Sequence, residues 1–305
     1  MLFKIFQKII AFFIAVFALG TPVAEPTITP ISVNPNPIIN APATFQDVKV
    51  MTFNVKITGE GYQSNDNRLP RVAKMIDRHG ADSVGVQEAD KWWTDNLEAA
   101  LPQYARVGAY RDDGKTLGES CSVFYLKDKY ELIESDTFWL SETPDVPSKG
   151  WDGGCSRVVT YAILKDKSTG FVYAHFNTHF DNVGEQAKAE SVPLLATRIA
   201  QIAPDIPVVL TGDFNSREGS EIYANLLACG LQNTKYLAEE YDDCATYADF
   251  NPFVLNTKPI DYVFVNGYVS SVKSSIVDSE MIDFVYPSDH FPIIVEITLF
   301  NGGNK

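Results

Sequence analysis

Basic residues and histidines are scarce in this chain of 305 residues. The chain has 25 Lys and Arg against 39 Asp and Glu, a formal net charge of −14, and 4 His. Proteins that grip long nucleic acids through many phosphates normally present a basic face. The charge therefore disfavours a processive or genome-scale nuclease.

Cysteine is also scarce, with 4 in the chain and no CxxC pair, which argues against a metal site built from thiolates. In an exported chain we expect them to form two disulfides, Cys229 with Cys244 and Cys121 with Cys155. The first would close a loop of about 15 residues and stabilise the fold by about 3 kcal/mol. Buried free thiols are the alternative, because a sequence does not determine connectivity.

The apolar run Ile9–Leu19 is too short to cross a bilayer comfortably. Lys4 and Lys8 precede it, and Ala18–Gly20 supplies small residues for cleavage. We therefore expect residues 1–20 to be a secretory signal peptide, and the mature protein to be secreted or extracytoplasmic without a stable membrane span. An uncleaved membrane anchor is the alternative. Cleavage would remove two lysines and no acid, and would take the net charge from −14 to −16.

Proline recurs through residues 21–46 without an amphipathic period, which predicts an extended linker. Residues 47–300 carry regular patterns instead. The chain is 45% hydrophobic and 12% aromatic, enough to bury a large core, and we expect one domain in this range.

Helical and strand-like patterns alternate in that domain, as in α/β proteins. Helices are expected at Asn67–His79, Trp92–Leu101 and Glu185–Ala203. Pro193 lies inside the third pattern and predicts a kink or a break there. Strands joined by turns predominate from Tyr104 to Phe180.

Asp213 and Asn215 follow the buried-type strand that begins at Pro207. Alternate side chains of a strand point to the same side, so these two emerge together at its carboxyl end. Carboxylate and amide groups suit Mg²⁺, a metal-bound water or a phosphoryl oxyanion. Asp and Asn are also favoured turn residues, so this pair alone is equally a polar turn.

Other polar residues stand at the junctions of predicted strands. Asn54, Glu88 and His179 come at strand ends, Asp261 at the beginning of a strand, and Asp289 and His290 just before the closing strand. Open α/β sheets bind ligands outside their strand ends, so these groups could share one crevice. Glu88 and Asn54 suit a divalent cation, and His179 can donate to a phosphoryl oxygen. His290 can act as a general base on water if a carboxylate orients its other nitrogen.

An ordered set of short motifs accompanies these residues. They are FNV at Phe53–Val55, QE at Gln87–Glu88, NTH at Asn177–His179, GDFNS at Gly212–Ser216, IDY at Ile260–Tyr262 and SDH at Ser288–His290. With them the chain resembles the endonuclease/exonuclease/phosphatase superfamily over about residues 47–299. The resemblance implies a four-layer α/β/β/α sandwich of two mixed β-sheets flanked by helices, as in deoxyribonuclease I. It also implies Mg²⁺-dependent attack of water on a phosphoester, in line with the leaving group, with Mn²⁺ as a possible substitute.

The resemblance assigns the metal side of the site to Asn54, Glu88 and Asp289. It assigns the nucleophile and the phosphate to Asp213 and Asn215.

For the histidines, the resemblance implies that Asp261 orients His290 and that His179 donates to the phosphate. Glu119 is similar in position to a glutamate that pairs with this histidine in deoxyribonuclease I, and Arg157 resembles an arginine that contacts the phosphate.

The motifs depart from those of the inositol polyphosphate 5-phosphatases at Leu210–Thr211 and Ser216–Arg217, which disfavours inositol phosphates. No aromatic hairpin suited to bilayer insertion is evident in the sequence, which weakens a sphingomyelinase-type phospholipid hydrolase. We expect a phosphodiesterase, either a nuclease or an enzyme for small diesters. A phosphomonoesterase is the alternative enzyme, and a binding domain that retains the fold is the alternative without catalysis.

The loop Tyr236–Asn256 lies just before Asp261, so we expect it at the rim of the crevice. Tyr247 and Phe250 would form an aromatic wall there, on which a nucleotide or a short single-stranded nucleic acid could stack. Packing of the loop is the alternative role for both rings. The oligomeric state stays open.

Overall fold

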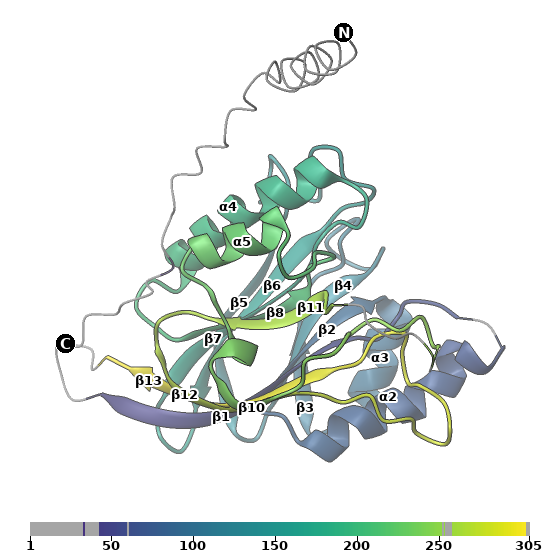
Figure 1. Ribbon diagram of the computed structural model, residues 1–305, viewed down its shortest axis with the longest axis horizontal. Coiled ribbons are helices and arrows are strands. Elements are labelled where there is room, and N and C mark those ends of the chain that lie inside the picture. The colour runs from purple at the N-terminus through teal and green to yellow at the C-terminus, as the bar shows by residue number, and fades with distance from the viewer. Residues whose placement is uncertain (1–32, 34–42, 60, 252, 254–257, 303–305) are drawn as a thin grey trace, which may run out of the picture. The chain divides into compact units, whose positions relative to one another are not determined.

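The structure, a computed structural model, describes residues 33, 43–59, 61–251, 253 and 258–302 (Figure 1). The expected signal peptide at residues 1–20 lies outside the described residues, as does most of the expected linker. Within that linker, Val33 is buried and its N–H donates to the Cys229 carbonyl at 2.9 Å. The first strand begins at Thr44. No helix within the described ranges is long and apolar enough to cross a membrane.

Two mixed β-sheets form the centre of the unit Ile31–Lys305. The first sheet has the strand order β10-β12-β13-β1-β2-β4-β3. Its strands are β1 (Thr44–Asn54), β2 (Ser83–Ala89), β3 (Tyr104–Val107), β4 (Ser120–Leu126), β10 (Ala238–Tyr241), β12 (Val269–Val277) and β13 (Ile293–Asn301). The second sheet has the order β5-β6-β7-β8-β11-β9. Its strands are β5 (Tyr130–Trp139), β6 (Val158–Asp166), β7 (Val172–His179), β8 (Val208–Asp213), β9 (Gln232–Asn233) and β11 (Asp261–Val265).

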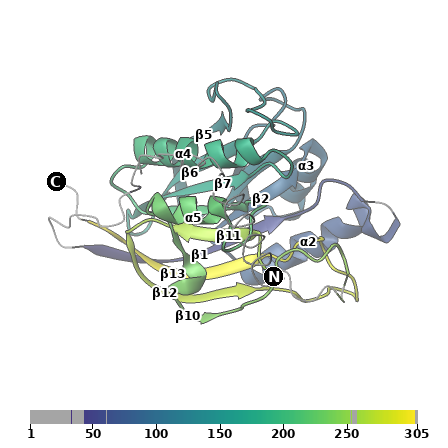
Figure 2. The ribbon, with the colours of Figure 1, turned by 45° about the horizontal axis from the view of Figure 1, so that its top comes forward.

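Helices cover the outer face of each sheet (Figure 2). They are α2 (Asn65–His79) and α3 (Lys91–Ala100) on the first sheet, and α4 (Glu185–Ile202) and α5 (Glu221–Ala228) on the second. Two single-turn 3-10 helices, η1 (Gly61–Gln63) and η2 (Thr234–Tyr236), complete the described elements. The four-layer α/β/β/α sandwich expected from the sequence is confirmed.

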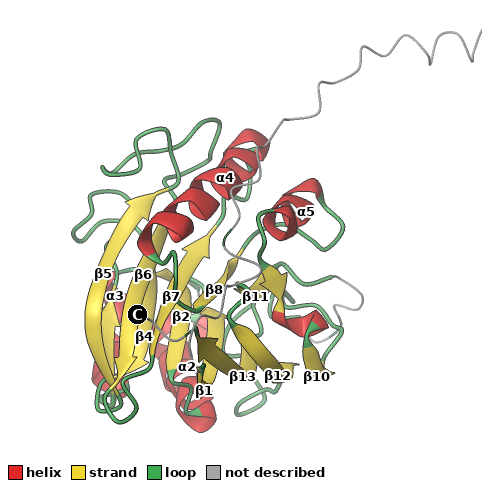
Figure 3. Ribbon diagram, turned by 90° about the vertical axis from the view of Figure 1, so that its left-hand side faces the viewer, coloured by secondary structure: helices red, strands yellow, loops and turns green. Residues whose placement is uncertain are grey.

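Strand alternation explains the layers, as β1 illustrates. Met51 and Phe53 point into the core under α2 and α3, whereas Val48 and Val50 point into the core between the two sheets. A strand that is buried on both faces carries apolar residues at successive positions. Figure 3 shows the two sheets packed face to face, with α4 outside the second sheet.

Strand directions bring the polar strand ends to one edge of the sandwich. The β1–β2 and β7–β8 pairs are parallel, so Asn54 lies beside Gln87, and His179 beside Asp213. β11 runs antiparallel to β8, so Asp261 at its start also pairs with Asp213. The start of β13 pairs with the end of β1, which brings the preceding Asp289 to the same edge.

Three features differ from the expectations. α4 continues through Pro193, because its buried face, which includes Leu195 and Ile199, packs against the second sheet and outweighs one lost backbone hydrogen bond. β10 and β12 were not predicted. β12 carries exposed serines and a lysine on its solvent side, and β10 is a short, largely exposed edge strand.

The two expected disulfides are not formed in this structure, where all four cysteines are free thiols. Cys121 packs with Trp139 and Val158, whereas the Cys155 thiol points to the Asp181 carboxylate, 3.9 Å away. Cys229 is buried at the end of α5, and Cys244 is exposed in the loop after β10. The members of each expected pair therefore lie in different surroundings.

Candidate active site

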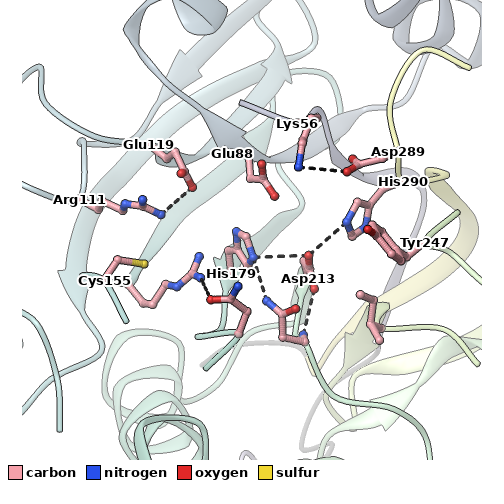
Figure 4. A pocket seen from close by; sticks show the side chains of 14 residues that line it. Lys56, Glu88, Arg111, Glu119, Cys155, His179, Asp213, Tyr247, Asp289 and His290 are labelled. Atoms are coloured by element: carbon pink, nitrogen blue, oxygen red, sulfur yellow. Dashed lines mark hydrogen bonds and ion pairs between the residues drawn. The ribbon is translucent and has the colours of Figure 1, made fainter. Parts of the chain in front are cut away.

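A cavity of about 420 Å³ opens at the sheet edge where the polar strand ends meet. Nine of the residues predicted for the site line this cavity. They are Glu88, Glu119, Arg157, His179, Asp213, Asn215, Tyr247, Asp289 and His290. Figure 4 shows their side chains pointing into a shared space from both sheets. Five further residues line the cavity that the sequence did not predict as site residues: Lys56, Arg111, Cys155, Asn182 and Ile260.

Asp213 lies at the centre of the site and is buried. Its Oδ2 lies 3.4 Å from His179 Nε2 and 3.7 Å from His290 Nε2. Its Oδ1 accepts a hydrogen bond from the Asn215 N–H at 2.9 Å. Burial and the neighbouring Asp261 carboxylate raise the pKa of Asp213 to about 7. Asp213 can therefore exchange a proton near neutral pH.

Asn215 turns sharply out of β8 with a φ of +47°. Asn tolerates this left-handed backbone better than most residues. Its side-chain nitrogen lies 3.0 Å from His179 Nε2 and donates to the Phe180 carbonyl. The turn thus holds Asn215 beside His179 and Asp213.

His290 and Asp261 form the expected buried pair, with 2.9 Å between Nδ1 and Oδ2. Burial lowers the pKa of His290, but the charges of Asp261 and Asp213 outweigh burial and raise it to about 10. His290 is then an imidazolium at neutral pH. A general base requires the neutral ring, so in this state His290 can donate a proton but not accept one.

Glu88 presents a charged carboxylate to the cavity. It lies within a bulge in the pairing of β2 with β4, between Val86 and Ala89, and has a φ of +59°. Burial raises its pKa, but hydrogen bonds from the Ile57 N–H at 3.0 Å and the Asn54 amide at 2.9 Å outweigh burial and lower it.

Asn54 lies behind the cavity and is fully buried. Its Nδ2 donates to Glu88 and, at 3.0 Å, to Asp213, while its Oδ1 accepts the Lys56 N–H. In this arrangement Asn54 holds two carboxylates in place instead of facing the cavity as a ligand.

These residues fit a divalent cation. One ligand atom from each of Glu88, His179 and Asp213 lies within 4.8 Å of the other two. His179 Nδ1 is buried without a hydrogen-bond partner among the described residues. The carboxylate oxygens that line the cavity, those of Asp289 included, are the donors that Mg²⁺ and Mn²⁺ prefer.

Two arginines also line the cavity. Arg157 Nε lies 3.4 Å from Asp181 Oδ2, and its Nη2 donates to Asn182 Oδ1 at 3.2 Å. Arg111 Nη1 donates to Glu119 at 2.6 Å.

The pairing of Glu119 with His179 is not formed in this structure. A backbone hydrogen bond from Arg111 to Glu119 at 2.9 Å places these two side chains next to each other, so Arg111 takes the carboxylate. His179 Nε2 faces Asn215 and Asp213 instead. Burial, followed by the nearby Arg157, holds the pKa of His179 well below its usual value, so the ring is neutral.

Asp181 is a buried carboxylate that the sequence did not single out, although it follows the NTH motif by two residues. It accepts backbone hydrogen bonds from Gly154, Val183 and Gly184 between 2.7 and 3.1 Å. It therefore joins Arg157 to the loop before β6 and to the start of α4.

Tyr247 and Phe250 lie in different surroundings, although both were predicted to line the cavity. Tyr247 lines the cavity with its ring centroid 5.0 Å from that of His290. Phe250 does not line it; the Phe250 ring centroid lies 5.8 Å from the guanidinium carbon of Arg68. Only Tyr247 can therefore contribute to the expected aromatic wall.

Comparisons with known proteins agree with this geometry. Residues 51–290 match the model of the Endonuclease/Exonuclease/phosphatase family. An endonuclease/exonuclease/phosphatase from Bacteroides vulgatus is 37% identical, with a TM-score of 0.80 over 83% of this chain and 99% of that one. A mannosyl-6-phosphatase from Bacteroides thetaiotaomicron is 32% identical, with a TM-score of 0.78 over 82% and 99%.

Nocturnin from Drosophila melanogaster is 24% identical over 86% of this chain. The match spans 48% of that nocturnin, so this chain corresponds to about half of it. Enzymes of the family act on phosphoester bonds and typically depend on a divalent metal. The chain belongs to the endonuclease/exonuclease/phosphatase family and is a phosphoester hydrolase.

Proposed function

We propose that this chain hydrolyses a phosphomonoester on a small soluble molecule, with Mg²⁺ as its metal and Mn²⁺ as a substitute. The observation that carries the proposal is one cavity lined both by the carboxylate and histidine cluster and by Arg111 and Arg157. Its volume of about 420 Å³ suits a small ligand.

The residues of the chain supply most of the chemistry. Asp213, at the centre of the cluster, orients the attacking water. The imidazolium of His290, oriented by Asp261, donates to a phosphoryl oxygen as negative charge develops there. A divalent cation at Glu88 and Asp213 would neutralise phosphate charge and activate the water.

Three observations favour a monoester. The two arginines that line the cavity suit the second negative charge of a monoester. The net charge of −14 disfavours a long polyanionic substrate. The mannosyl-6-phosphatase of Bacteroides thetaiotaomicron, aligned over 99% of its chain, supports a phosphorylated sugar as the substrate class.

A phosphodiester in a dinucleotide or a short single strand is the second candidate, as expected from the sequence. The observation that favours it is Tyr247, whose ring is 37% exposed on the cavity wall. Stacking of a base on an aromatic ring contributes about 1–3 kcal/mol. Relatives such as nocturnin support a nucleotide less strongly, because their identity to this chain is lower.

A panel of phosphoesters tests the proposal. Purified protein is assayed with Mg²⁺ and then with EDTA on p-nitrophenyl phosphate, mannose 6-phosphate, bis-p-nitrophenyl phosphate and a dinucleotide. We expect EDTA-sensitive release of phosphate from the monoesters at least tenfold faster than cleavage of the diesters. The reverse order supports the second candidate. No hydrolysis of any member would favour a binding domain that retains the fold.

Tyr247→Ala separates the two candidates further, with Phe250→Ala as the matched control outside the cavity. A nucleotide substrate predicts that Tyr247→Ala loses about 5- to 100-fold on the dinucleotide and much less on bis-p-nitrophenyl phosphate. Equal losses on both substrates would mean that Tyr247 does not stack on a base.

We also propose that residues 1–20 direct export, on the basis of the basic start and the apolar run alone. N-terminal sequencing of the protein from its native cells tests this. A mature end near residue 20 supports cleavage, and an intact Met1 on membranes supports an anchor.

A further inference from the structure

Lys56 places a positive charge among the carboxylates of the site. Its Nζ lies 3.2 Å from Asp289 Oδ2, and Figure 4 shows the amino group directed towards Glu88 and Asp289. The Asp289 side chain is 2% exposed, whereas that of Lys56 is 36% exposed. A buried carboxylate requires a nearby counter-charge, and Lys56 supplies it from the solvent side.

The backbone of Lys56 is fixed on both sides. Its N–H donates to Asn54 Oδ1 at 3.0 Å, and its carbonyl accepts a hydrogen bond from Arg68 Nη2 at 2.7 Å. Arg68 itself is fully buried. Lys56 also has a φ of +58°, a left-handed conformation that is unfavourable for a residue with a Cβ. The fold therefore holds this lysine at the cavity at a conformational cost.

The ion pairs of the basic side chains separate two parts of the cavity. Lys56 pairs with Asp289, and the arginines pair with Glu119 and Asp181. Among the described residues, no lysine or arginine lies within 4.0 Å of the carboxylates of Glu88 and Asp213. A divalent cation is therefore best placed at Glu88 and Asp213.

We propose that Lys56 takes the place of a second divalent cation, so that the cavity binds one such ion beside Glu88 and Asp213 while the ammonium covers Asp289. Two-metal phosphoesterases hold their ions about 3.5–4 Å apart. Here the Glu88 and Asp213 side is open for an ion, and the Asp289 side is already neutralised. The inference rests on the proposed metal dependence and adds the number of ions and the residue that limits it.

Counting bound Mn²⁺ tests the inference without an activity assay. Metal-free protein is titrated with Mn²⁺, and free ion is measured by its electron paramagnetic resonance signal. We expect one ion per wild-type chain. Lys56→Met keeps the side-chain length, removes the charge and should bind two ions. Lys56→Arg keeps the charge and should bind one.

A double variant shows whether the second ion uses Asp289. Lys56→Met with Asp289→Asn should bind one ion again, because the carboxylate released by the first change is removed by the second. Melting curves of each variant verify that it is folded.

Two ions in the wild-type chain, or one in folded Lys56→Met, would overturn the inference. Two ions in the wild type would leave the proposed metal-dependent hydrolysis intact. Absence of Mn²⁺ binding by the wild type would contradict that function as well. If Lys56→Met does not fold, the number of Mn²⁺ ions bound by the wild-type chain still tests the inference.

Discussion

Three residues that line the cavity hold left-handed backbone conformations: Lys56, Glu88 and Asn215, with φ of +58°, +59° and +47°. Each such conformation costs about 1–2 kcal/mol for a residue with a Cβ. Glu88 lies at the end of β2, and the other two follow β1 and β8 within two residues. The cost is thus concentrated where side chains must turn from a sheet into the cavity.

Glu88→Gln should raise the Mg²⁺ concentration needed for half-maximal activity at least tenfold, because the charge that a hard cation requires is lost. The melting temperature should fall only by a few degrees. Glu88 now accepts hydrogen bonds from the Asn54 amide and the Ile57 N–H, and the new side-chain nitrogen of Gln would face one of these donors. A Mg²⁺ titration of activity beside a melting curve measures both. Wild-type turnover of Glu88→Gln at limiting Mg²⁺ would rule out Glu88 as a metal-side residue.

His290→Ala should lower turnover by about 10²–10⁴, the range for losing a group that assists proton transfer or charge stabilisation. Asp261→Asn should also lower it, and the double variant should be little worse than His290→Ala, since the pair acts as a unit. Multiplicative losses would mean that the two residues act independently.

The pH behaviour of His290 follows from the same pair. Asp261 and Asp213 raise the pKa of the ring to about 10, so the ring is charged below that pH and loses its proton above it. Asp261→Asn removes one of the two charges and should lower this pKa, as NMR of the imidazole in the metal-free protein can measure. An unchanged pKa would show that Asp261 does not control the charge of His290.

The sequence identified the residues at strand ends because period-two patterning and short motifs place them there. It did not identify Lys56 and Arg111, since their partners depend on tertiary structure. Lys56 follows β1 and pairs with Asp289, which precedes β13. Arg111 pairs with Glu119 because the turn between them brings the two side chains together. The prediction that Phe250 lines the cavity is wrong, because the loop after Tyr247 turns the Phe250 ring towards Arg68.

At the scale of elements, Asp181 connects β7, α4 and the loop before β6. Its carboxylate accepts N–H groups from that loop and from the residues just before α4. Burial raises its pKa, but these hydrogen bonds and Arg157 outweigh burial and lower it. One buried side chain thus fixes both the loop and Arg157.

Asp181→Asn should lower the free energy of unfolding at pH 7 by about 1–3 kcal/mol, because buried N–H groups lose an acceptor. The folded pKa lies below the unfolded value of about 3.9, so the stabilisation is present above pH 4 and is lost as the pH falls through the folded pKa. Urea unfolding at pH 7 and pH 3 should show a smaller effect at pH 3.

The control is Asp145→Asn, which removes an exposed carboxylate that pairs with Arg198. Its effect should stay within about 1 kcal/mol at both pH values. An effect of Asp181→Asn no larger than this would contradict the assigned role.

Elements with a strong apolar pattern were predicted close to their observed bounds. α2 (Asn65–His79) begins two residues before the predicted helix and ends at the predicted residue, with Gly80 in the left-handed conformation after it. β10 and β12 were missed because exposed acids on the edge strand β10, and exposed serines and a lysine on its neighbour β12, obscure the strand pattern. The continuity of α4 at Pro193 depends on packing against the second sheet, which local sequence does not reveal.

At the scale of the whole molecule, a chain with a net charge of −14 places Lys56, Arg111 and Arg157 among the carboxylates of one cavity. Each of these basic side chains pairs with a carboxylate, so binding of an anion there would depend on a divalent cation as well. Long polyanions would meet repulsion from the acidic protein outside the cavity, which fits the proposed small substrate.

Binding of Mg²⁺ should stabilise the whole fold, since the ion relieves repulsion among buried carboxylates. At 100 times its dissociation constant, a ligand that binds only the folded state adds about 2.7 kcal/mol. Melting curves with Mg²⁺ and with EDTA should differ accordingly in the wild type, and much less in Glu88→Gln. The same shift in both proteins would place the ion elsewhere.

The most direct measurement is hydrolysis of p-nitrophenyl phosphate and bis-p-nitrophenyl phosphate by the wild type and by Asp213→Asn, each with Mg²⁺ and with EDTA. Asp213 is at the centre of the proposed cluster. Asp213→Asn should therefore lower, at least 100-fold, the rate on whichever of the two substrates the wild type hydrolyses faster. EDTA should abolish the wild-type reaction, and added Mg²⁺ should restore it. Hydrolysis that survives EDTA, or that Asp213→Asn retains at the wild-type rate, would contradict a metal-dependent phosphoesterase centred on this cavity.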